Sequence, residues 1–135
     1  GDLEQIAQII EHSPDDFGVW SGNDGDTLPI LAIGGFGVVS VASHLVGRQI
    51  SAMIAASLAG EHEAAAVMHR KMLPLVDAIF FESSPSPLKF ALQEIGFDAG
   101  PPRLPLLEAS EAAQAQMRAE LSHQTIDLPV PVPGL

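Results

Sequence analysis

The chain has no cysteine and no tyrosine, and it has few basic residues. Its 135 residues include six lysines and arginines against 17 aspartates and glutamates, which gives a formal net charge of -11. The absence of cysteine excludes disulfides, thiolate metal sites and cysteine nucleophiles. It is compatible with a reducing compartment, and we expect a cytoplasmic location. The shortage of clustered positive charge argues against nucleic acid as a partner.

Long apolar runs are also missing. The sequence has no stretch of about 18 apolar residues that would indicate a transmembrane span, and no basic amphipathic helix suggests a membrane surface. We therefore expect no membrane partner. Hydrophobic residues nevertheless make up 47% of the chain, and the mean hydropathy is +0.25. This composition is typical of core strands whose partners lie elsewhere.

Two apolar runs close together predict two strands. The run over residues 17–20 stops at the polar sequence SGND, and residues 37–41, GVVSV, are apolar on both faces. Strands of the second kind belong to parallel sheets covered by helices. Between the runs, Thr27 is expected to cap a helix over residues 28–33. Strand, helix and strand form a βαβ unit, the repeat of α/β barrels and doubly wound sheets.

Glycine, proline and capping residues set the other expected boundaries. Gly34 and Gly35 end the helix of the βαβ unit as a tight turn, because glycine adopts the left-handed conformation that a helix C-terminus needs. Asp2 is the N-cap of a first helix, with Gln5 three residues later, and Ser110 caps the last one. The expected helices are residues 2–12, 50–59, 61–80, 87–95 and 111–122, with an extended connection over 98–105.

Motifs in a fixed order along the chain resemble one family. They are SGND at 21–24, GGFGVVSVAS at 34–43, HRKMLPL at 69–75, FESSPSPLK at 81–89 and RLPL at 103–106. This set resembles the last two barrel strands and the C-terminal helices of dihydrodipicolinate synthase. That enzyme belongs to the pyruvate-dependent, Schiff-base lyase family, which also contains N-acetylneuraminate lyase.

The resemblance implies an α/β fold, the C-terminal portion of a TIM (β/α)8 barrel followed by a helical subdomain. The portion runs from helix 6 through strand 7, helix 7 and strand 8 to helix 8. It implies three segments: the last βα units at residues 1–60, the helical subdomain at 61–123, and a proline-rich tail at 124–135 that is extended or mobile.

The family's catalytic lysine has no counterpart among the motifs of this chain. In the family it ends the sixth strand, a few residues before a Gly-Asp/Asn-Leu sequence that starts the sixth helix. Here Gly1-Asp2-Leu3 comes first, so we expect the N-terminal barrel half to be missing. The only lysines, Lys71 and Lys89, fall in helical segments and are poor Schiff-base candidates. The family's proton-shuttle tyrosine is missing too, and we expect the 135-residue chain alone to be inactive, with no catalytic residue.

Gly22 and Val39 are the substrate-binding candidates. The resemblance places backbone groups at these two positions against bound pyruvate, with the main-chain oxygen of Val39 taking part. The alternative interpretation is a turn glycine and a core valine. Gly22 follows the first predicted strand and Val39 lies in the second, and βα barrels carry their chemistry at the C-terminal ends of such strands.

Other polar residues favour structural roles. The acidic loop at Asn23, Asp24 and Asp26 could supply paired carboxylates or a hard-cation site, but we favour a solvated turn with an Asx cap. His62 and His69 lie seven residues apart, which is the wrong spacing for a metal site on a helix, so no metal is expected. His44 is expected in a loop.

For the whole protein, the resemblance implies condensation of pyruvate with aspartate semialdehyde in lysine and diaminopimelate biosynthesis. No separate cofactor is implied, because the imine is itself the electron sink, and the family is commonly a homotetramer. Two alternatives stay open. One is a sister aldolase acting on N-acetylneuraminate or a keto-deoxy sugar acid. The other is a non-catalytic, stand-alone half-barrel that assembles through its open strand edges.

Overall fold

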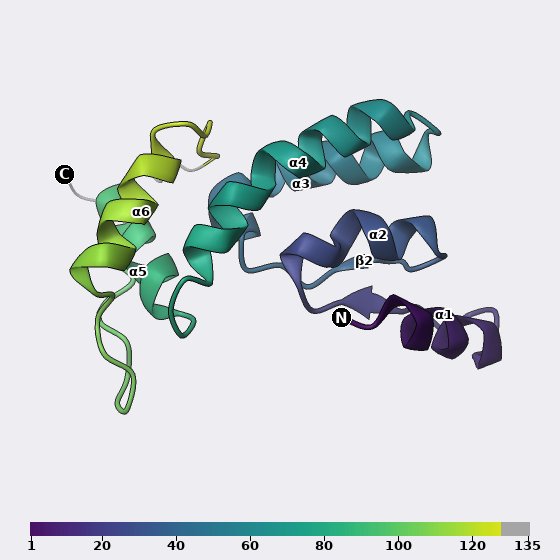
Figure 1. Ribbon diagram of the computed structural model, residues 1–135, viewed down its shortest axis with the longest axis horizontal. Helices are drawn as coiled ribbons and strands as arrows, with labels where there is room; N and C mark the ends of the chain where they lie inside the picture. The colour runs from purple at the N-terminus through teal and green to yellow at the C-terminus, as the bar shows by residue number, and fades with distance from the viewer. Residues whose placement is uncertain (128–135) are drawn as a thin grey trace. The chain divides into compact units, whose positions relative to one another are not determined.

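The computed structural model describes residues 1–127 and contains mostly helices (Figure 1). Two compact units divide the chain: Gly1–Val41 with Arg48–Lys71, and Ala42–Gly47 with the chain from Met72 onward. The expected segment boundaries stay predictions, and most of the expected tail lies outside the described residues. The elements are α1 (Leu3–His12), β1 (Trp20–Ser21), η1 (Asp24–Asp26), α2 (Thr27–Ala32), β2 (Gly37–Val38), α3 (Ser43–Leu58), α4 (His62–Ile79), α5 (Ser86–Glu94) and α6 (Glu111–Leu121).

The first unit contains the predicted βαβ arrangement. β1 and β2 pair in parallel, with Trp20 opposite Gly37 and Ser21 opposite Val38. Both strands are shorter than expected. Residues 17–19 precede the ladder, because Phe17 closes a turn onto Pro14. Residues 40 and 41 follow β2, and there the Ser40 hydroxyl and the Val41 amide donate to the Asp24 carboxylate.

α2 packs against β2 and begins differently from the prediction (Figure 1). Asp26 occupies the N-cap position, and Thr27 is the first helical residue. The Thr27 hydroxyl donates to the Asp24 carbonyl at 2.8 Å, so Thr27 is not the cap that the sequence suggested. Gly34 does end the helix, with φ of 99°, which confirms the expected tight turn before β2.

The helix boundaries are confirmed where a cap is local. The Asp2 carboxylate accepts from the amides of Glu4 and Gln5 at the start of α1, and Ser110 accepts from Ala113 at the start of α6. α3, however, begins at Ser43, seven residues before the predicted start at residue 50, and it bends at Val46. His44 therefore lies in a helix and not in a loop.

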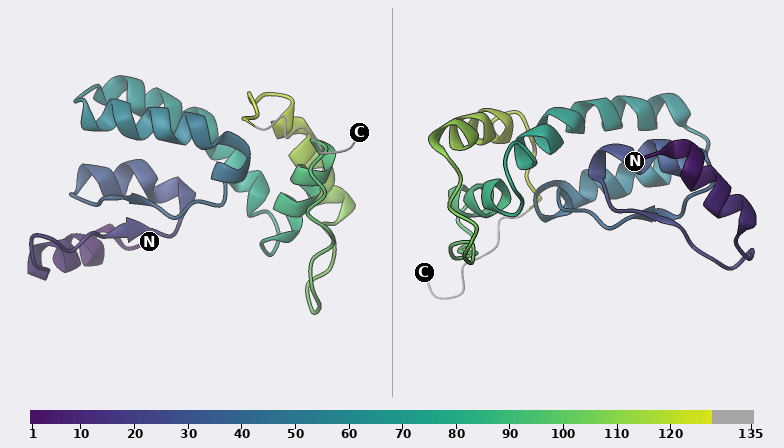
Figure 2. Two further views of the ribbon diagram at one scale, coloured as in Figure 1. Left: turned by 180° about the vertical axis from the view of Figure 1, so that it is seen from behind. Right: turned by 60° about the horizontal axis from the view of Figure 1, so that its bottom comes forward.

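Two helical pairs complete the units. In the first unit, the second part of α3 and the first part of α4 run antiparallel beside each other (Figure 2). In the second unit, α5 packs against α6. The predicted inner face of α4 is confirmed, because its members are buried apart from the half-buried Met68: Ala65, Met72, Leu75, Val76 and Ile79. Among residues 1–127, no helix combines the length and apolarity needed to cross a membrane.

Candidate active-site edge

Gly22 and Val39 lie next to each other at one edge of the strand pair. Each follows the last paired residue of its strand, since Ser21 and Val38 are opposite each other in the parallel register. The Val39 amide donates to the Ser21 carbonyl at 2.8 Å. Parallel strands end at the same edge, so the two residues lie together there, although the sequence put Val39 inside a strand that ended at residue 41. Their role as substrate contacts stays a prediction.

This edge is open in the described structure. A Cβ atom added to Gly22 would have no neighbour within 4 Å, and Val39 is 72% exposed. Val39 is therefore not packed as a core residue in this unit. Space is available beside both backbones for a small molecule or for other parts of a larger protein.

Asp24 is the group in this region that the sequence interpretation missed. It is only 6% exposed, whereas a solvated turn was favoured. Its carboxylate accepts from the Ser40 hydroxyl and, at 3.1 Å, from the Val41 amide. Asp24 thus links the loop after β1 to the segment after β2. The burial of a charged group is explained by these donors, because buried carboxylates need hydrogen-bond partners.

The rest of the loop follows the favoured interpretation. The Asn23 side chain accepts from the Gly25 amide at 3.3 Å, which is the predicted Asx cap. The Asn23 side-chain amide donates to Asp26 at 3.0 Å. Asp24 and Asp26 therefore have different bonding partners. Among the described residues, no group of three or more histidine, aspartate and glutamate side chains is placed to hold a metal.

His69 on α4 lies in a partly buried environment. Burial lowers the pKa of His69 below 6.5, the Arg70 charge lowers the pKa further, and the Asp26 carboxylate opposes both effects. The Nδ1 atom of His69 is buried without a hydrogen-bond partner among the described residues. His62, seven residues earlier, is exposed. The two histidines thus have different surroundings, and their structural or surface role stays a prediction.

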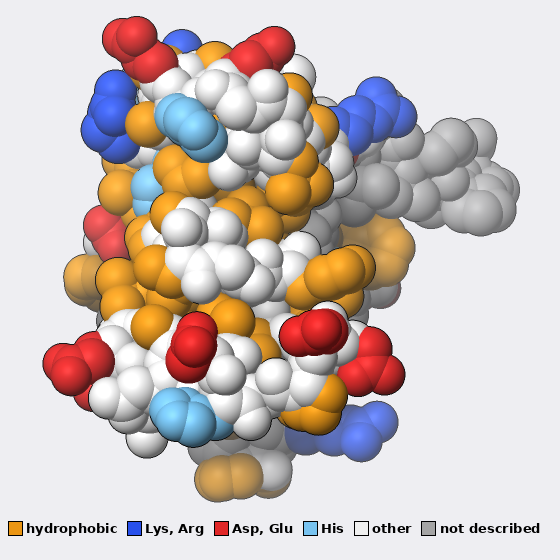
Figure 3. Space-filling model, turned by 90° about the vertical axis from the view of Figure 1, so that its right-hand side faces the viewer, with side chains coloured by type: hydrophobic (Ala, Val, Ile, Leu, Met, Phe, Trp, Pro, Cys, Tyr) orange, Lys and Arg blue, Asp and Glu red, His pale blue; other side chains and the backbone are white. Residues whose placement is uncertain are grey.

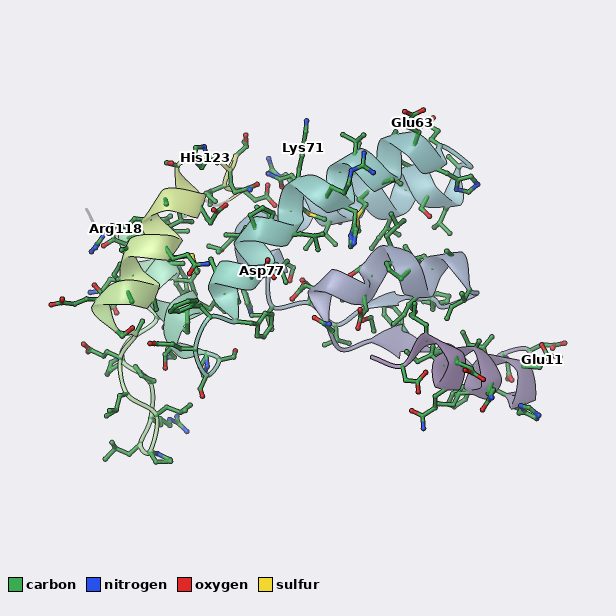
Figure 4. All side chains as sticks on the ribbon, viewed as in Figure 1. Glu11, Glu63, Lys71, Asp77, Arg118 and His123 are labelled. Atoms are coloured by element: carbon green, nitrogen blue, oxygen red, sulfur yellow. The ribbon has the colours of Figure 1, made fainter. Side chains whose placement is uncertain are left out.

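The two lysines have different environments, and neither is typical of a Schiff-base nucleophile. Lys71 is exposed and projects outward from α4 (Figure 4). The Lys89 ammonium donates to the carbonyls of Ala99, Gly100 and Pro101 at 2.7, 3.3 and 3.2 Å. Three such contacts use all three N–H donors of an ammonium group, whereas a nucleophilic lysine needs a neutral nitrogen.

The order of motifs and the geometry agree with a comparison to known families. The sequence model of the dihydrodipicolinate synthetase family matches residues 1–124. The chain belongs to this family. The match includes residues of both units, and all the motifs that suggested the resemblance lie within it.

Relatives within the dihydrodipicolinate synthetase family are close in sequence. A 4-hydroxy-tetrahydrodipicolinate synthase of Dehalococcoides mccartyi (strain CBDB1) is 52% identical over 130 residues, covering 96% of this chain and 44% of that protein. Another, from Halalkalibacterium halodurans, is 48% identical over 124 residues, covering 92% of this chain and 42% of that protein. The chain thus spans less than half the length of these relatives.

Solved structures share its fold. The DHDPS of Cyanidioschyzon merolae with lysine bound superposes with a TM-score of 0.89 at 41% identity, covering 91% of this chain and 42% of that one. The chloride-inhibited dihydrodipicolinate synthase of Acinetobacter baumannii complexed with pyruvate gives a TM-score of 0.83 at 28% identity, covering 90% and 42%. The described units thus have the fold of a corresponding part of these dihydrodipicolinate synthases.

Proposed function

We propose that this chain forms the C-terminal portion of a TIM barrel that condenses pyruvate with aspartate semialdehyde in lysine and diaminopimelate biosynthesis. In this proposal β1 and β2 are the seventh and eighth barrel strands. The synthases among its relatives support the reaction, and they favour it over the sister aldolases that the sequence left open.

The observation that carries the proposal is the position of Gly22 and Val39. They sit side by side where two parallel strands end, with open space beside them. The chemistry of TIM barrels takes place at this end of the strands. A structural relative was solved with pyruvate, a small ketoacid that backbone groups at such an edge can contact.

The residues of this chain bind and orient the substrate in the proposed site. The Val39 carbonyl is a hydrogen-bond acceptor facing pyruvate, and Gly22 allows the ligand to approach the backbone because it has no side chain. A lysine elsewhere in the barrel forms the Schiff base. Lys71 and Lys89 do not replace it, so the 135-residue chain alone is inactive. The imine accepts electrons itself, so the reaction uses no separate cofactor.

The exposed apolar surface supports a larger barrel and a homo-oligomer. Hydrophobic side chains reach the surface between acidic ones on the face drawn in Figure 3. The rings of Trp20 and Phe36 are in contact, tilted by 49° with their centres 4.8 Å apart, yet the two residues are 51% and 65% exposed. We propose that the remaining barrel strands cover this pair. α1 buries none of its ten residues, and its apolar face is available to a second subunit of a cytoplasmic homotetramer.

The test compares this chain with a hybrid barrel. The hybrid joins the N-terminal part of the Dehalococcoides mccartyi synthase to this chain in place of the matching segment. Each protein is incubated with pyruvate and borohydride, and its intact mass is measured. We expect one trapped pyruvate on the hybrid and none on the chain alone, with synthase activity only in the hybrid.

Two results would contradict the proposal. A folded hybrid that traps no pyruvate would contradict the proposal that Gly22 and Val39 belong to a pyruvate site. An adduct on the chain alone would mean that Lys71 or Lys89 reacts, and peptide mapping would show which one. Gly22→Val in the hybrid is the matched site variant, because a Cβ atom there has no neighbour within 4 Å in this unit and the added side chain enters the open space. It should raise the KM for pyruvate.

A further inference from the structure

Val39 is fixed on both sides by hydrogen bonds to the chain around β1. Its own amide donates to the Ser21 carbonyl at 2.8 Å. Two residues later, the Val41 amide donates to Asp24 Oδ2 at 3.1 Å, and between them the Ser40 hydroxyl donates to Asp24 Oδ1. The Val39 carbonyl belongs to the peptide that lies between these two attachments. Its direction is therefore set by β1 on one side and by Asp24 on the other.

Asp24 is itself held firmly. The side chain is almost completely buried, and so is that of Thr27, at 6% and 2% exposure. The Thr27 hydroxyl donates to the Asp24 carbonyl at 2.8 Å. Just before Asp24, the Asn23 amide donates to the buried Ser21 hydroxyl at 3.0 Å, and that hydroxyl donates to the Asn23 carbonyl at 2.7 Å. The carboxylate is thus a fixed anchor and not a mobile surface group.

We propose that Asp24 is a positioning residue, which holds the Val39 carbonyl in the direction needed to contact pyruvate. This inference rests on the proposed function, in which that carbonyl faces the substrate. Asp24 acts through Ser40 and Val41 and does not touch the substrate. A site built from backbone groups depends on such support, because a backbone oxygen displaced by a fraction of an ångström loses its contact.

The hybrid barrel allows the test, with three substitutions. Asp24→Asn keeps the size of the side chain, but its NH2 group cannot accept a hydrogen bond, so one of the two attachments is lost. Ser40→Ala removes the hydroxyl donor alone. Asp26→Asn is the matched control. It also removes a carboxylate from the 310 helix, but the Asp26 carboxylate has no bond to the segment after β2 among the described residues.

The expected result is a change in KM for pyruvate. Asp24→Asn should lower kcat/KM for pyruvate about 10- to 100-fold, mainly through KM, while the KM for aspartate semialdehyde changes little. Ser40→Ala should give a smaller change in the same direction, and Asp26→Asn should not change the KM for pyruvate. A purely structural role would reduce the amount of active enzyme, and hence apparent kcat, without changing KM.

Unchanged pyruvate KM values in Asp24→Asn and Ser40→Ala would overturn the inference. If Asp24→Asn does not fold, Ser40→Ala decides. Hydrogen exchange of a peptide containing residues 39–41 gives a readout that does not depend on catalysis. Faster exchange in Asp24→Asn than in Asp26→Asn supports the attachment, and equal exchange overturns it. If the unsubstituted hybrid traps no pyruvate, the proposed function fails, while this exchange still decides whether Asp24 holds the segment.

Discussion

At the scale of single residues, the turn between α2 and β2 depends on Gly35. Its amide donates to the Ile30 carbonyl at 2.8 Å. A Cβ atom at this position would lie 2.1 Å from Ile30 Cγ2 and 2.8 Å from the Ile30 oxygen. The backbone of Gly35 thus packs directly on the end of α2. This contact brings β2 beside β1, and therefore brings Val39 beside Gly22.

Gly35→Ala should destabilise the protein. The added methyl group overlaps both the side chain and the backbone of Ile30, so the turn must move, at a cost of about 1–3 kcal/mol. Urea denaturation measures the change. Gly47→Ala is the matched control, because a Cβ there meets its nearest neighbour at 3.6 Å. At Gly47, within α3, alanine also favours the helix over glycine by about 0.5–1 kcal/mol. Equal stability of the two variants would refute this view of the turn.

His69 should make stability depend on pH. Because burial lowers its pKa in the folded chain below 6.5, the unfolded chain binds more protons between the two pKa values. The contribution of His69 to stability is complete above pH 6.5 and is lost as the pH falls from 6.5 toward the folded pKa.

His69→Gln should remove this part of the pH dependence. Urea midpoints measured between about pH 7 and about pH 5 should fall less steeply in the variant than in the original chain. The control is His62→Gln on the same helix, where the side chain is exposed and the slope should be kept. A slope that is the same in His69→Gln and the original chain would show that His69 does not cause it.

At the scale of elements, the helix caps could be predicted from the sequence and the extent of strand pairing could not. The caps at Asp2 and Ser110 depend on residues within one turn, so the sequence located both helices. The extent of β2 depends on partners far along the chain. Ser40 and Val41 look like strand residues, but the Val41 amide and the Ser40 hydroxyl donate to the Asp24 side chain.

The same distinction explains the errors in the candidate site. Gly22 could be placed at a strand end because it follows an apolar run, whereas Val39 was expected inside the strand over residues 37–41 and lies after β2. Asp24 was assigned to a solvated turn because nothing in the sequence SGNDGD distinguishes a buried carboxylate from an exposed one. The early start of α3 was missed because Gly47 interrupts the helical pattern, and the helix indeed bends beside it at Val46.

Lys89 connects α5 to residues 99–101, in the proline-rich connection that follows this helix. Lys89→Met keeps the apolar stem but removes three hydrogen bonds to the carbonyls of residues 99–101. We expect a loss of about 1–3 kcal/mol, since hydrogen bonds from charged groups are among the stronger ones. Trypsin should also cleave after the exposed Arg103 faster than in the original chain. Lys71→Met is the control, and equal cleavage rates in the two variants would contradict a role for Lys89 in holding the segment.

At the scale of the whole molecule, the two-stranded sheet is the weak point of the 135-residue chain. In the described residues β1 and β2 pair only with each other, which leaves one edge of each strand open. Isolated two-stranded sheets are marginal in water, and open edges pair with other chains. Trp20, Phe36 and Val39, which lie in or next to these strands, add exposed apolar surface. The chain by itself should therefore associate with copies of itself.

Sedimentation velocity at increasing protein concentration should show this self-association. Val39→Lys should reduce it, because a charged side chain beside an open strand edge opposes pairing with another chain. Leu58→Lys is the matched control: Leu58 is 75% exposed, similar to Val39, but it ends α3. Equal effects of the two substitutions would point to general hydrophobic association, and a monomer at every concentration would exclude association through the strands. In the hybrid barrel, where we propose that the remaining strands cover these edges, Val39→Lys should instead impair pyruvate binding and leave the association state unchanged.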